Sequence, residues 1–255
     1  MGTAHDAHFV LGDDMLHHHD DGDVAIITLN RPERRNALSG DLCDMIGEVI
    51  HEKEARGSRA IVITGEGTSF CSGADLDGVY GEAFLVSLYG LFNKIMDAKM
   101  PVIAAVNGPA IGAGTQLAIA CDLRVVDSPA VFGVPTARNG LAVDPWTIRR
   151  LAELAGGGAA RRLLLGAGQI NRDEAHAAGL VDRAGTLHDA VEWAHDIATL
   201  APLSLAYSKT VLNNPDRDLD DPTFVDNFEA CFNSEDVAEG RLARAEKRKP
   251  RFTGR

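Results

Sequence analysis

The stretch that decides the fold runs over residues 101–126 and reads PVIAAVNGPAIGAGTQLAIACDLRVV. It begins with an apolar run at 101–106, which is typical of a strand that is buried on both faces. A turn of small residues follows at 108–114, then a helical segment at 115–121 and a further apolar strand at 123–126. A strand, a glycine-rich turn, a helix and a strand in direct succession indicate an α/β fold with a parallel sheet.

The same alternation extends toward the N-terminus. Apolar runs at 24–29 and 60–64 predict two more strands, and apolar residues at helical spacing predict helices at 39–53 and 83–97. Ser39 is the expected N-cap of the first of these helices. Beyond residue 141 the pattern is mostly helical. The helices expected there cover 147–165, 173–179, 187–200, 202–213 and 222–248, and 181–183 is a short strand candidate.

The 255 residues are expected to form one domain. Residues 1–23 are expected to form a disordered N-terminal extension, because they are rich in aspartate and histidine, and the ordered fold is expected to begin at the apolar run that starts at Val24. The histidines at 17–19 are interpreted as part of that extension, and no metal site is expected. Residues 24–195 form the expected α/β core, and residues 196–255 form a helical region of the same domain.

Composition excludes several classes of function. Lys and Arg number 25 against 37 Asp and Glu, and the net charge of −12 argues against a general nucleic-acid binder and against docking on an anionic membrane. No apolar run is long enough for a transmembrane segment, and no signal-peptide pattern is present. Four scattered cysteines without CxxC spacing indicate reduced thiols and a cytoplasmic location. Residues 241–255 are locally basic, which suits either a solvated surface or contact with an anion.

Two glycine-containing clusters are the candidates for chemistry. Residues 70–76 read FCSGADL, and residues 106–116 read VNGPAIGAGTQ. Neither cluster is a GxGxxG or a phosphate-loop motif, so the nucleotide-binding patterns are absent. Small residues at such junctions permit tight packing, but they also aim bare backbone N–H groups at a ligand. Two such turns could converge into an oxyanion hole.

With these motifs the chain resembles the crotonase (enoyl-CoA hydratase/isomerase) family from about Val24 to Arg255. The matching segments are 30–38 (NRPERRNAL), 70–76, 101–123, 132–135 (FGVP) and 178–182 (AGLVD). The resemblance implies a spiral of ββα units with a helical C-terminal trimerisation region. It further implies homotrimers that stack into homohexamers.

The resemblance also implies the ligand, a fatty acyl-CoA or enoyl-CoA thioester, with no other cofactor. The thioester oxygen would be held by the backbone N–H groups of Ser72 and Ala113. The family usually has glycine at the second of these positions, and donation survives the change if the backbone φ there is negative. The substrate-binding residues implied are Ala37, Ser72, Gly73, Ala74, Asp75, Leu76 and Ala113.

The catalytic positions depart from the family pattern. Hydration requires a base that activates water and an acid that protonates the α-carbon, and the family's hydratases use two glutamates for this. Gln116 and Thr136 stand at the two matching positions. An amide does not titrate and a threonine hydroxyl is no base near neutral pH without activation. The resemblance therefore predicts a hydratase, whereas these residues argue against one.

Asp144 is the remaining candidate carboxylate, because some isomerases of the family move a proton with an Asp at this position. Alternatively, Asp144 caps a helix that begins at Pro145. Three functions stay open: an acyl-CoA carrier with little or no hydratase activity, an isomerase that uses Asp144, and a hydratase with unrecognised acid and base residues. The Asp-Pro-Trp segment at 144–146 and the paired loss of the glutamates are similar to a mycobacterial branch of the family, which favours the carrier in lipid metabolism.

Overall fold

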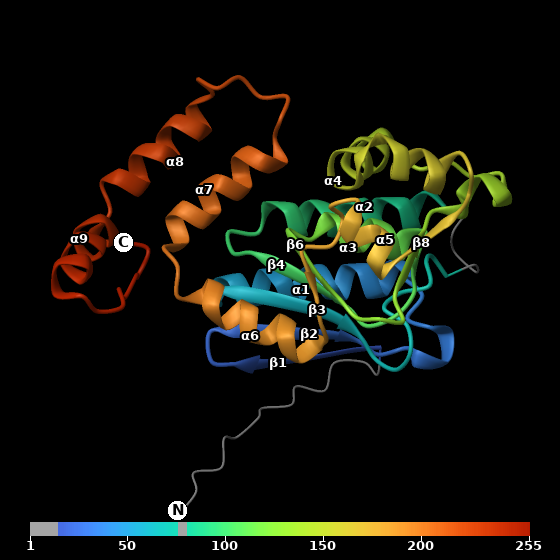
Figure 1. Cartoon of the computed structure of the whole chain (residues 1–255), viewed down its shortest axis with the longest axis horizontal. Coiled ribbons are helices and arrows are strands. Elements are labelled where there is room, and N and C mark those ends of the chain that lie inside the picture. The colour runs from blue at the N-terminus through green and yellow to red at the C-terminus, as the bar shows by residue number, and fades with distance from the viewer. Residues whose placement is uncertain (1–14, 76–80) are drawn as a thin grey trace, which may run out of the picture.

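The computed structural model describes residues 15–75 and 81–255. Its main sheet has six strands in the order β1-β2-β3-β4-β6-β9 (Figure 1). These strands are β1 (Leu16–Asp21), β2 (Val24–Leu29), β3 (Ala60–Gly65), β4 (Val102–Val106), β6 (Leu123–Val126) and β9 (Arg183–Ala184). From β2 to β9 all pairings are parallel, as the fully apolar strands predict, and β1 alone of the described strands in this sheet pairs antiparallel.

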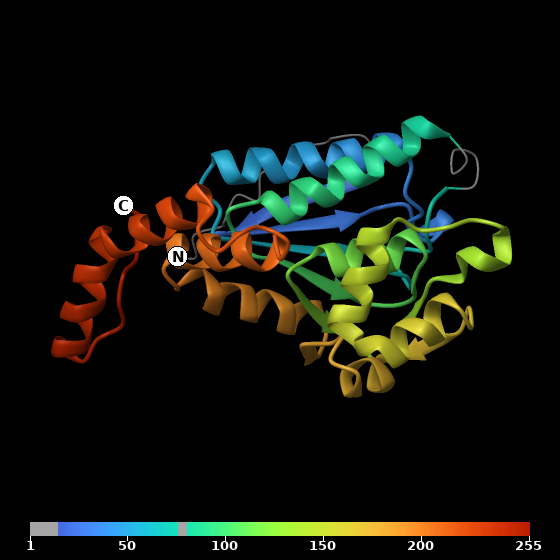
Figure 2. The same ribbon diagram turned by 90° about the horizontal axis from the view of Figure 1, so that it is seen from above.

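Helices cover both faces of this sheet. Helices α1 (Gly40–Ala55) and α2 (Glu82–Asp97) lie on one face and α6 (Leu187–Ala198) lies on the other (Figure 2). The expected cap of α1 is confirmed, because Ser39 Oγ accepts a hydrogen bond of 3.2 Å from the N–H of Leu42. The strand candidate at 181–183 is displaced by two residues, and β9 comprises only Arg183–Ala184.

A second, three-stranded sheet carries the glycine-rich turn. It consists of β5 (Ala110–Ile111), β7 (Val131–Gly133) and β8 (Gln169–Asn171). These strands have two or three residues each, which is too short for the periodicity that identifies strands from sequence. Helix α3 (Ala113–Ala120) follows β5 directly, so the chain after β4 forms one ββα unit. The short helices η1 (Pro32–Arg34), η2 (Pro135–Asn139) and α5 (Arg172–Ala177) and the long helix α4 (Pro145–Leu164) complete the body.

The C-terminal helices α7 (Pro202–Asn213), α8 (Pro222–Phe232) and α9 (Glu235–Glu246) lie at one end of the molecule (Figures 1 and 2). The single helix predicted over 222–248 is wrong, since the chain breaks between α8 and α9. Ser234 lies at this break, immediately before α9, and its Oγ donates a 2.7 Å hydrogen bond to the carbonyl of Cys231 at the end of α8. The boundary expected at 195/196 falls inside α6. No helix in the described ranges is long and apolar enough to cross a membrane.

The N-terminal boundary is corrected by β1. Residues 16–21 were expected within a disordered extension, but they pair with β2 over the whole strand, from Leu16 opposite Leu29 to Asp21 opposite Val24. Leu16 is buried in the core, and Asp20 forms a 2.7 Å ion pair with the buried Lys53 of α1. An edge strand needs few apolar residues, because only part of one face is covered. Residues 1–14 lie outside the described part of the chain.

His18 gives β1 a predicted dependence on pH. Its Nδ1 is buried with no hydrogen-bond partner among the described residues. Burial and, next, the cation of Lys53 lower the pKa of His18 below 6.5, while Arg56 acts in the same direction and Glu52 and Asp20 oppose them. A folded-state pKa below the unfolded value means that the unfolded chain binds more protons, so stability falls as the pH drops below about 6.5.

Wild-type protein is therefore expected to lose stability between pH 7 and pH 5 relative to the His18→Gln variant. Urea unfolding of both proteins at a series of pH values measures the difference. Parallel pH profiles for the two proteins would contradict this prediction.

Candidate functional site

Two loops meet at the carboxyl ends of β3 and β4. The first contains Cys71, whose N–H donates to Pro109 O at 3.2 Å and whose carbonyl accepts from the N–H of Ile111 at 2.9 Å. These bonds form a parallel bridge between Cys71 and Ala110. A Cβ on Gly114 would lie 2.0 Å from Cys71 O, so a glycine is required where α3 passes under the first loop. The two sequence clusters therefore form one backbone structure.

The N–H of Ser72, one of the two expected donors, has a partner inside the chain. Its N–H donates a 2.9 Å hydrogen bond to the carbonyl of Arg35, so this donor is already used inside the chain. The carbonyl of Gly73 accepts from the N–H of Leu38 at 2.8 Å, and the N–H of Asp75 donates to Leu38 O at 2.7 Å. Ala74 lies between these two bonds, and its own N–H points to the opposite side, because successive peptide groups alternate along an extended chain. In this loop the N–H without a partner among the described residues is therefore that of Ala74, not that of Ser72.

Ala113 occupies the first position of α3. Gly112 precedes it with φ +56, and the N–H of Gly112 donates to Gly133 O at 2.7 Å. The described non-glycine residues with positive φ do not include Ala113, so the condition for donation by an alanine there is met. A Cβ built on Gly73 would lie 3.9 Å from the nitrogen of Ala113. The first loop therefore packs directly against the start of α3.

No hydrogen bond from the N–H of either Ala74 or Ala113 occurs among the described residues. The first N–H groups of a helix lack intrahelical partners, and the helix dipole adds positive potential at that end. Two free N–H groups on touching backbone segments suit a ligand oxygen that carries partial negative charge.

Asp75 and Ala37 have structural partners. Asp75 forms ion pairs with Arg31 at 2.8 Å and with Arg34 at 3.1 Å. Arg31 also donates to the carbonyl of Ala37 at 2.6 Å. This arginine therefore joins the segment at 30–38 to the first loop, a role that its place in the motif alone did not reveal. Leu76, the last of the implied substrate-binding residues, lies outside the described residues.

Gln116 stands in a polar cluster that joins three helices. Its Nε2 donates to Thr147 Oγ1 at 2.8 Å and lies 3.5 Å from Asp144 Oδ2. The cluster also includes Tyr89 of α2, whose hydroxyl interacts with Asp144 and Gln116. Burial and, next, the Asp144 carboxylate raise the pKa of Tyr89. The structure thus brings the Gln116 and Asp144 predicted from sequence together, and adds Tyr89 and Thr147, which no motif identified.

Asp144 is the N-cap of α4, which was one of the two roles predicted for it. Its Oδ1 accepts from the N–H of Thr147 at 3.1 Å, and its Oδ2 accepts from Thr147 Oγ1 at 2.5 Å. Pro145 occupies the first helical position. Trp146 packs its ring on Phe92 with a centroid separation of 5.7 Å. The Asp144 carboxylate is therefore surrounded by donors beside an aromatic pair.

Thr136 lies in η2, three residues after the end of β7. Its carbonyl accepts from the N–H of Leu141 at 3.0 Å. No side-chain hydrogen bond in the described residues links it to Gln116. Within the described part of the chain, the Thr136 hydroxyl therefore has no hydrogen bond to a titratable side chain.

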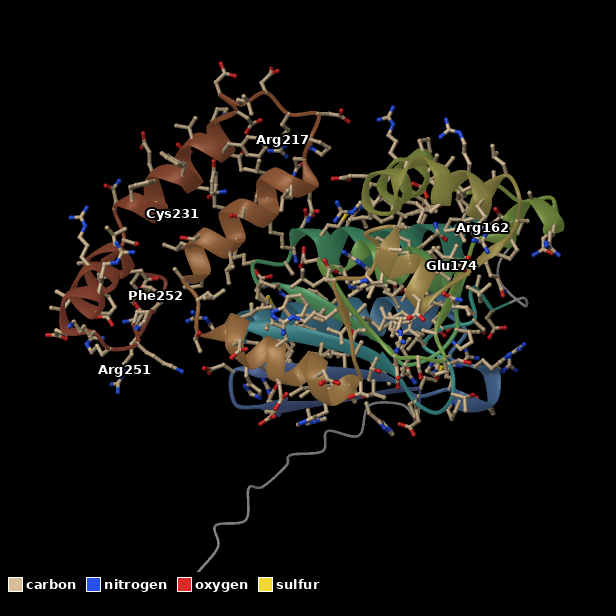
Figure 3. All side chains as sticks on the ribbon, viewed as in Figure 1. Arg162, Glu174, Arg217, Cys231, Arg251 and Phe252 are labelled. Carbon is tan, nitrogen blue, oxygen red and sulfur yellow. The ribbon has the colours of Figure 1, made fainter. Side chains whose placement is uncertain are left out.

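Two further groups near the candidate site are excluded from direct roles. Burial raises the pKa of the Cys71 thiol to about 12, so this cysteine is a core residue rather than a thiolate nucleophile. The basic C-terminal segment folds back on α9, where Arg248 pairs with Glu239 at 2.6 Å. Figure 3 shows Arg251 and Phe252 at the end of the molecule opposite to Arg162 and Glu174. The segment therefore lies far from α4 within its own chain.

Comparison with protein families matches residues 19–255 to the family described as Enoyl-CoA hydratase/isomerase. The chain belongs to this family, and the crotonase resemblance is confirmed.

Among similar proteins, the "Probable enoyl-CoA hydratase echA6" of Mycobacterium tuberculosis is 47% identical over 91% of this chain and 96% of its own length. The "Short-chain-enoyl-CoA hydratase" of Clostridium acetobutylicum is 34% identical over 90% of this chain and 94% of its own. Among solved structures, a "Putative enoyl-CoA hydratase/isomerase family protein" from Hyphomonas neptunium has a TM-score of 0.86 at 32% identity, covering 94% and 98% of the two chains. The match to mycobacterial relatives confirms the branch that the sequence resembles.

Proposed function

We propose that this protein binds fatty acyl-CoA thioesters and has little or no hydratase activity. One observation supports the proposal: the amide of Gln116, which the family resemblance aligns with a catalytic glutamate, is held by Thr147 and Asp144. Positioned acids and bases contribute typically 10²–10⁴-fold to a rate. Without both glutamates the site retains polarisation of the thioester and lacks the proton transfers of hydration.

In this proposal the thioester oxygen is held by the N–H groups of Ala74 and Ala113, and Ala74 replaces Ser72 in the pair of donors expected from the sequence. The support for this assignment is that the Ser72 donor is used by Arg35, whereas the other two N–H groups are free of partners in the described chain. No cofactor other than the CoA of the ligand enters the proposal. Backbone donors require no side-chain chemistry, so binding is independent of the lost glutamates.

Proline at position 113 is expected to weaken acyl-CoA binding about tenfold, because one hydrogen bond to the thioester is lost. The substitution removes the N–H while keeping a residue that the first turn of a helix tolerates. Isothermal titration with dodecanoyl-CoA measures the effect. The Ala113→Ser variant is the control, since it keeps the N–H at nearly the same size. Equal affinities of Ala113→Pro and Ala113→Ser would contradict the assignment.

The absence of hydratase activity is tested with crotonyl-CoA and a longer 2-enoyl-CoA. The ultraviolet absorbance of the conjugated thioester is expected to stay constant, while titration with a saturated acyl-CoA gives a binding isotherm. Turnover at an ordinary enzymatic rate would refute the carrier function. An Asp144→Asn variant tests the isomerase alternative. If Asp144 is the catalytic residue of an isomerase, the wild-type protein moves the double bond of a 3-enoyl-CoA and this variant does not. The contacts of Asp144 disfavour this alternative, because each of its carboxylate oxygens already accepts a hydrogen bond from Thr147.

Assembly into homotrimers or homohexamers is part of the same proposal. Its support is an exposed aromatic ridge on α8, where Phe228 and Phe232 are 47% and 65% exposed. Light scattering on the purified protein is expected to give the mass of three or six chains. A monomeric mass at micromolar concentration would refute the assembly.

A further inference from the structure

Helix α4 is not one continuous helix. Gly156 has φ +74 and ψ 156, which interrupts the helical backbone between residues 145–155 and 157–164. A Cβ on Gly156 or on Gly158 would meet no atom within 4 Å, so packing does not require a glycine at either position. Three consecutive glycines inside a helix lower its stability, because glycine gains the most conformational freedom when the helix opens. The segment at Gly156–Gly158 has the properties of a hinge.

The half of α4 before this hinge is held at its start by the polar cluster. Asp144 and Thr147 connect it to Gln116 of α3 and Tyr89 of α2. The stacked ring of Trp146 adds a contact with Phe92 of α2. These contacts join the start of α4 to α2 and α3 beside Gln116, which lies one helical turn after the N–H of Ala113. An acyl chain that extended from that N–H past Gln116 would meet these side chains.

Room for movement exists on the outer side of the same half-helix. A cavity of about 380 Å³ lies between the start of α4 and the end of α7. Residues 146, 149, 150 and 153 line it from α4, and this i, i+3, i+4, i+7 spacing is one stripe of the helix. The opposite stripe, with Thr147, Leu151 and Ala155, is buried. The ion pair across the cavity, Arg149 to Asp216, is 3.7 Å long and exposed on both sides, so it adds little resistance.

We propose that residues 145–155 form a hinged wall that swings about Gly156–Gly158 into this cavity, and that the contacts of Asp144 form its latch. The inference rests on the proposed acyl-CoA binding and identifies long-chain thioesters as the ligands that open the wall. A short acyl chain fits within the closed site. A long chain enters only when the latch contacts break, so the hinge and latch set the chain length that the site admits.

The test uses Gly158→Ala, which stiffens the hinge without a steric clash. The matched control is Gly240→Ala in the middle of α9, where a Cβ makes only ordinary contacts with Phe252. Trp193→Phe serves as the background, so that Trp146 is the single tryptophan reporting on the wall. Gly158→Ala is expected to raise Tm by about 2–4 °C. It should slow stopped-flow association of dodecanoyl-CoA about tenfold and leave butyryl-CoA unchanged. Tyr89→Phe weakens the latch and should therefore accelerate the association of dodecanoyl-CoA.

Hydrogen exchange without ligand separates the two proposals. Amides at 147–155 are expected to exchange faster than those at 159–164 in the parent protein, and Gly158→Ala should slow the first set. If neither thioester binds, the proposed function fails while this exchange difference still tests the hinge. The hinged wall is refuted if both halves of α4 exchange alike, or if Gly158→Ala changes association of both thioesters equally.

Discussion

Replacing Lys209 with methionine is expected to destabilise the protein by about 3–5 kcal/mol at neutral pH, the range for breaking a buried ion pair. The Lys209 ammonium lies 2.7 Å from Asp122 and donates to Met100 O at 3.0 Å, and its side chain is 6% exposed. It thereby fastens α7, the first of the C-terminal helices, to the loop before β6. Without it, a carboxylate remains at a site that water hardly reaches.

The loss is expected to depend on pH. Burial raises the pKa of Asp122, and Lys209 is the main group that counteracts the rise. When the cation is absent, the folded-state pKa rises further above the unfolded value, so the penalty grows as the pH increases and shrinks toward pH 4. Chemical unfolding at pH 4.5 and pH 7.5 measures both quantities. The Lys209→Met/Asp122→Asn double variant should recover part of the stability, and a double variant no better than the single one would contradict the explanation.

The second large effect is expected from Gln116→Glu, which places a second carboxyl group beside Asp144. The side chain at 116 is 5% exposed and its amide lies 3.5 Å from Asp144. A second carboxylate there replaces a hydrogen-bond donor with a like charge. We expect a loss of about 2–4 kcal/mol at pH 8, the range for a buried charge without a partner.

The sign of the pH dependence follows from the raised pKa of the new carboxyl group. It is neutral below its unfolded value of about 4.3, so the penalty is small there and increases as the pH rises through its folded-state pKa. Gln116→Met is the control, since it loses the hydrogen bonds without adding a charge, and its penalty should not vary with pH. Adding Asp144→Asn to Gln116→Glu should relieve the repulsion. Equal losses for the glutamate and methionine variants across pH would refute the argument.

The sequence predicted most of the main sheet because its parallel strands are fully apolar and bounded by turns. It failed at β1, where Leu16 is accompanied by three histidines and two aspartates. Such an edge strand is stabilised by pairing with β2, which no local pattern records. It also failed at 222–248, where a serine side chain that bonds the preceding turn interrupts an otherwise helical composition.

The candidate site was predicted at the level of loops and less well at the level of atoms. Small residues at the ends of strands indicated backbone donors, but the direction of each N–H depends on pairing between distant segments. The bond from Ser72 to Arg35 joins parts of the chain 37 positions apart, so no local pattern indicates that the N–H of Ser72 has a partner. Tyr89 was missed for a related reason, since a single tyrosine on a helix has no motif and becomes informative only when Asp144 lies beside it.

The bridge between Cys71 and Ala110 has a consequence for how this family changes over time. The donors that face a ligand are main-chain atoms whose positions are fixed by pairing and by glycines, whereas proton transfer depends on two replaceable side chains. Under the proposed function, substitution at positions 116 and 136 removes proton transfer and leaves the main-chain donors in place. One or two side-chain substitutions can therefore convert such a catalyst into a binding protein that is retained for transport or sensing, and its fold does not have to change.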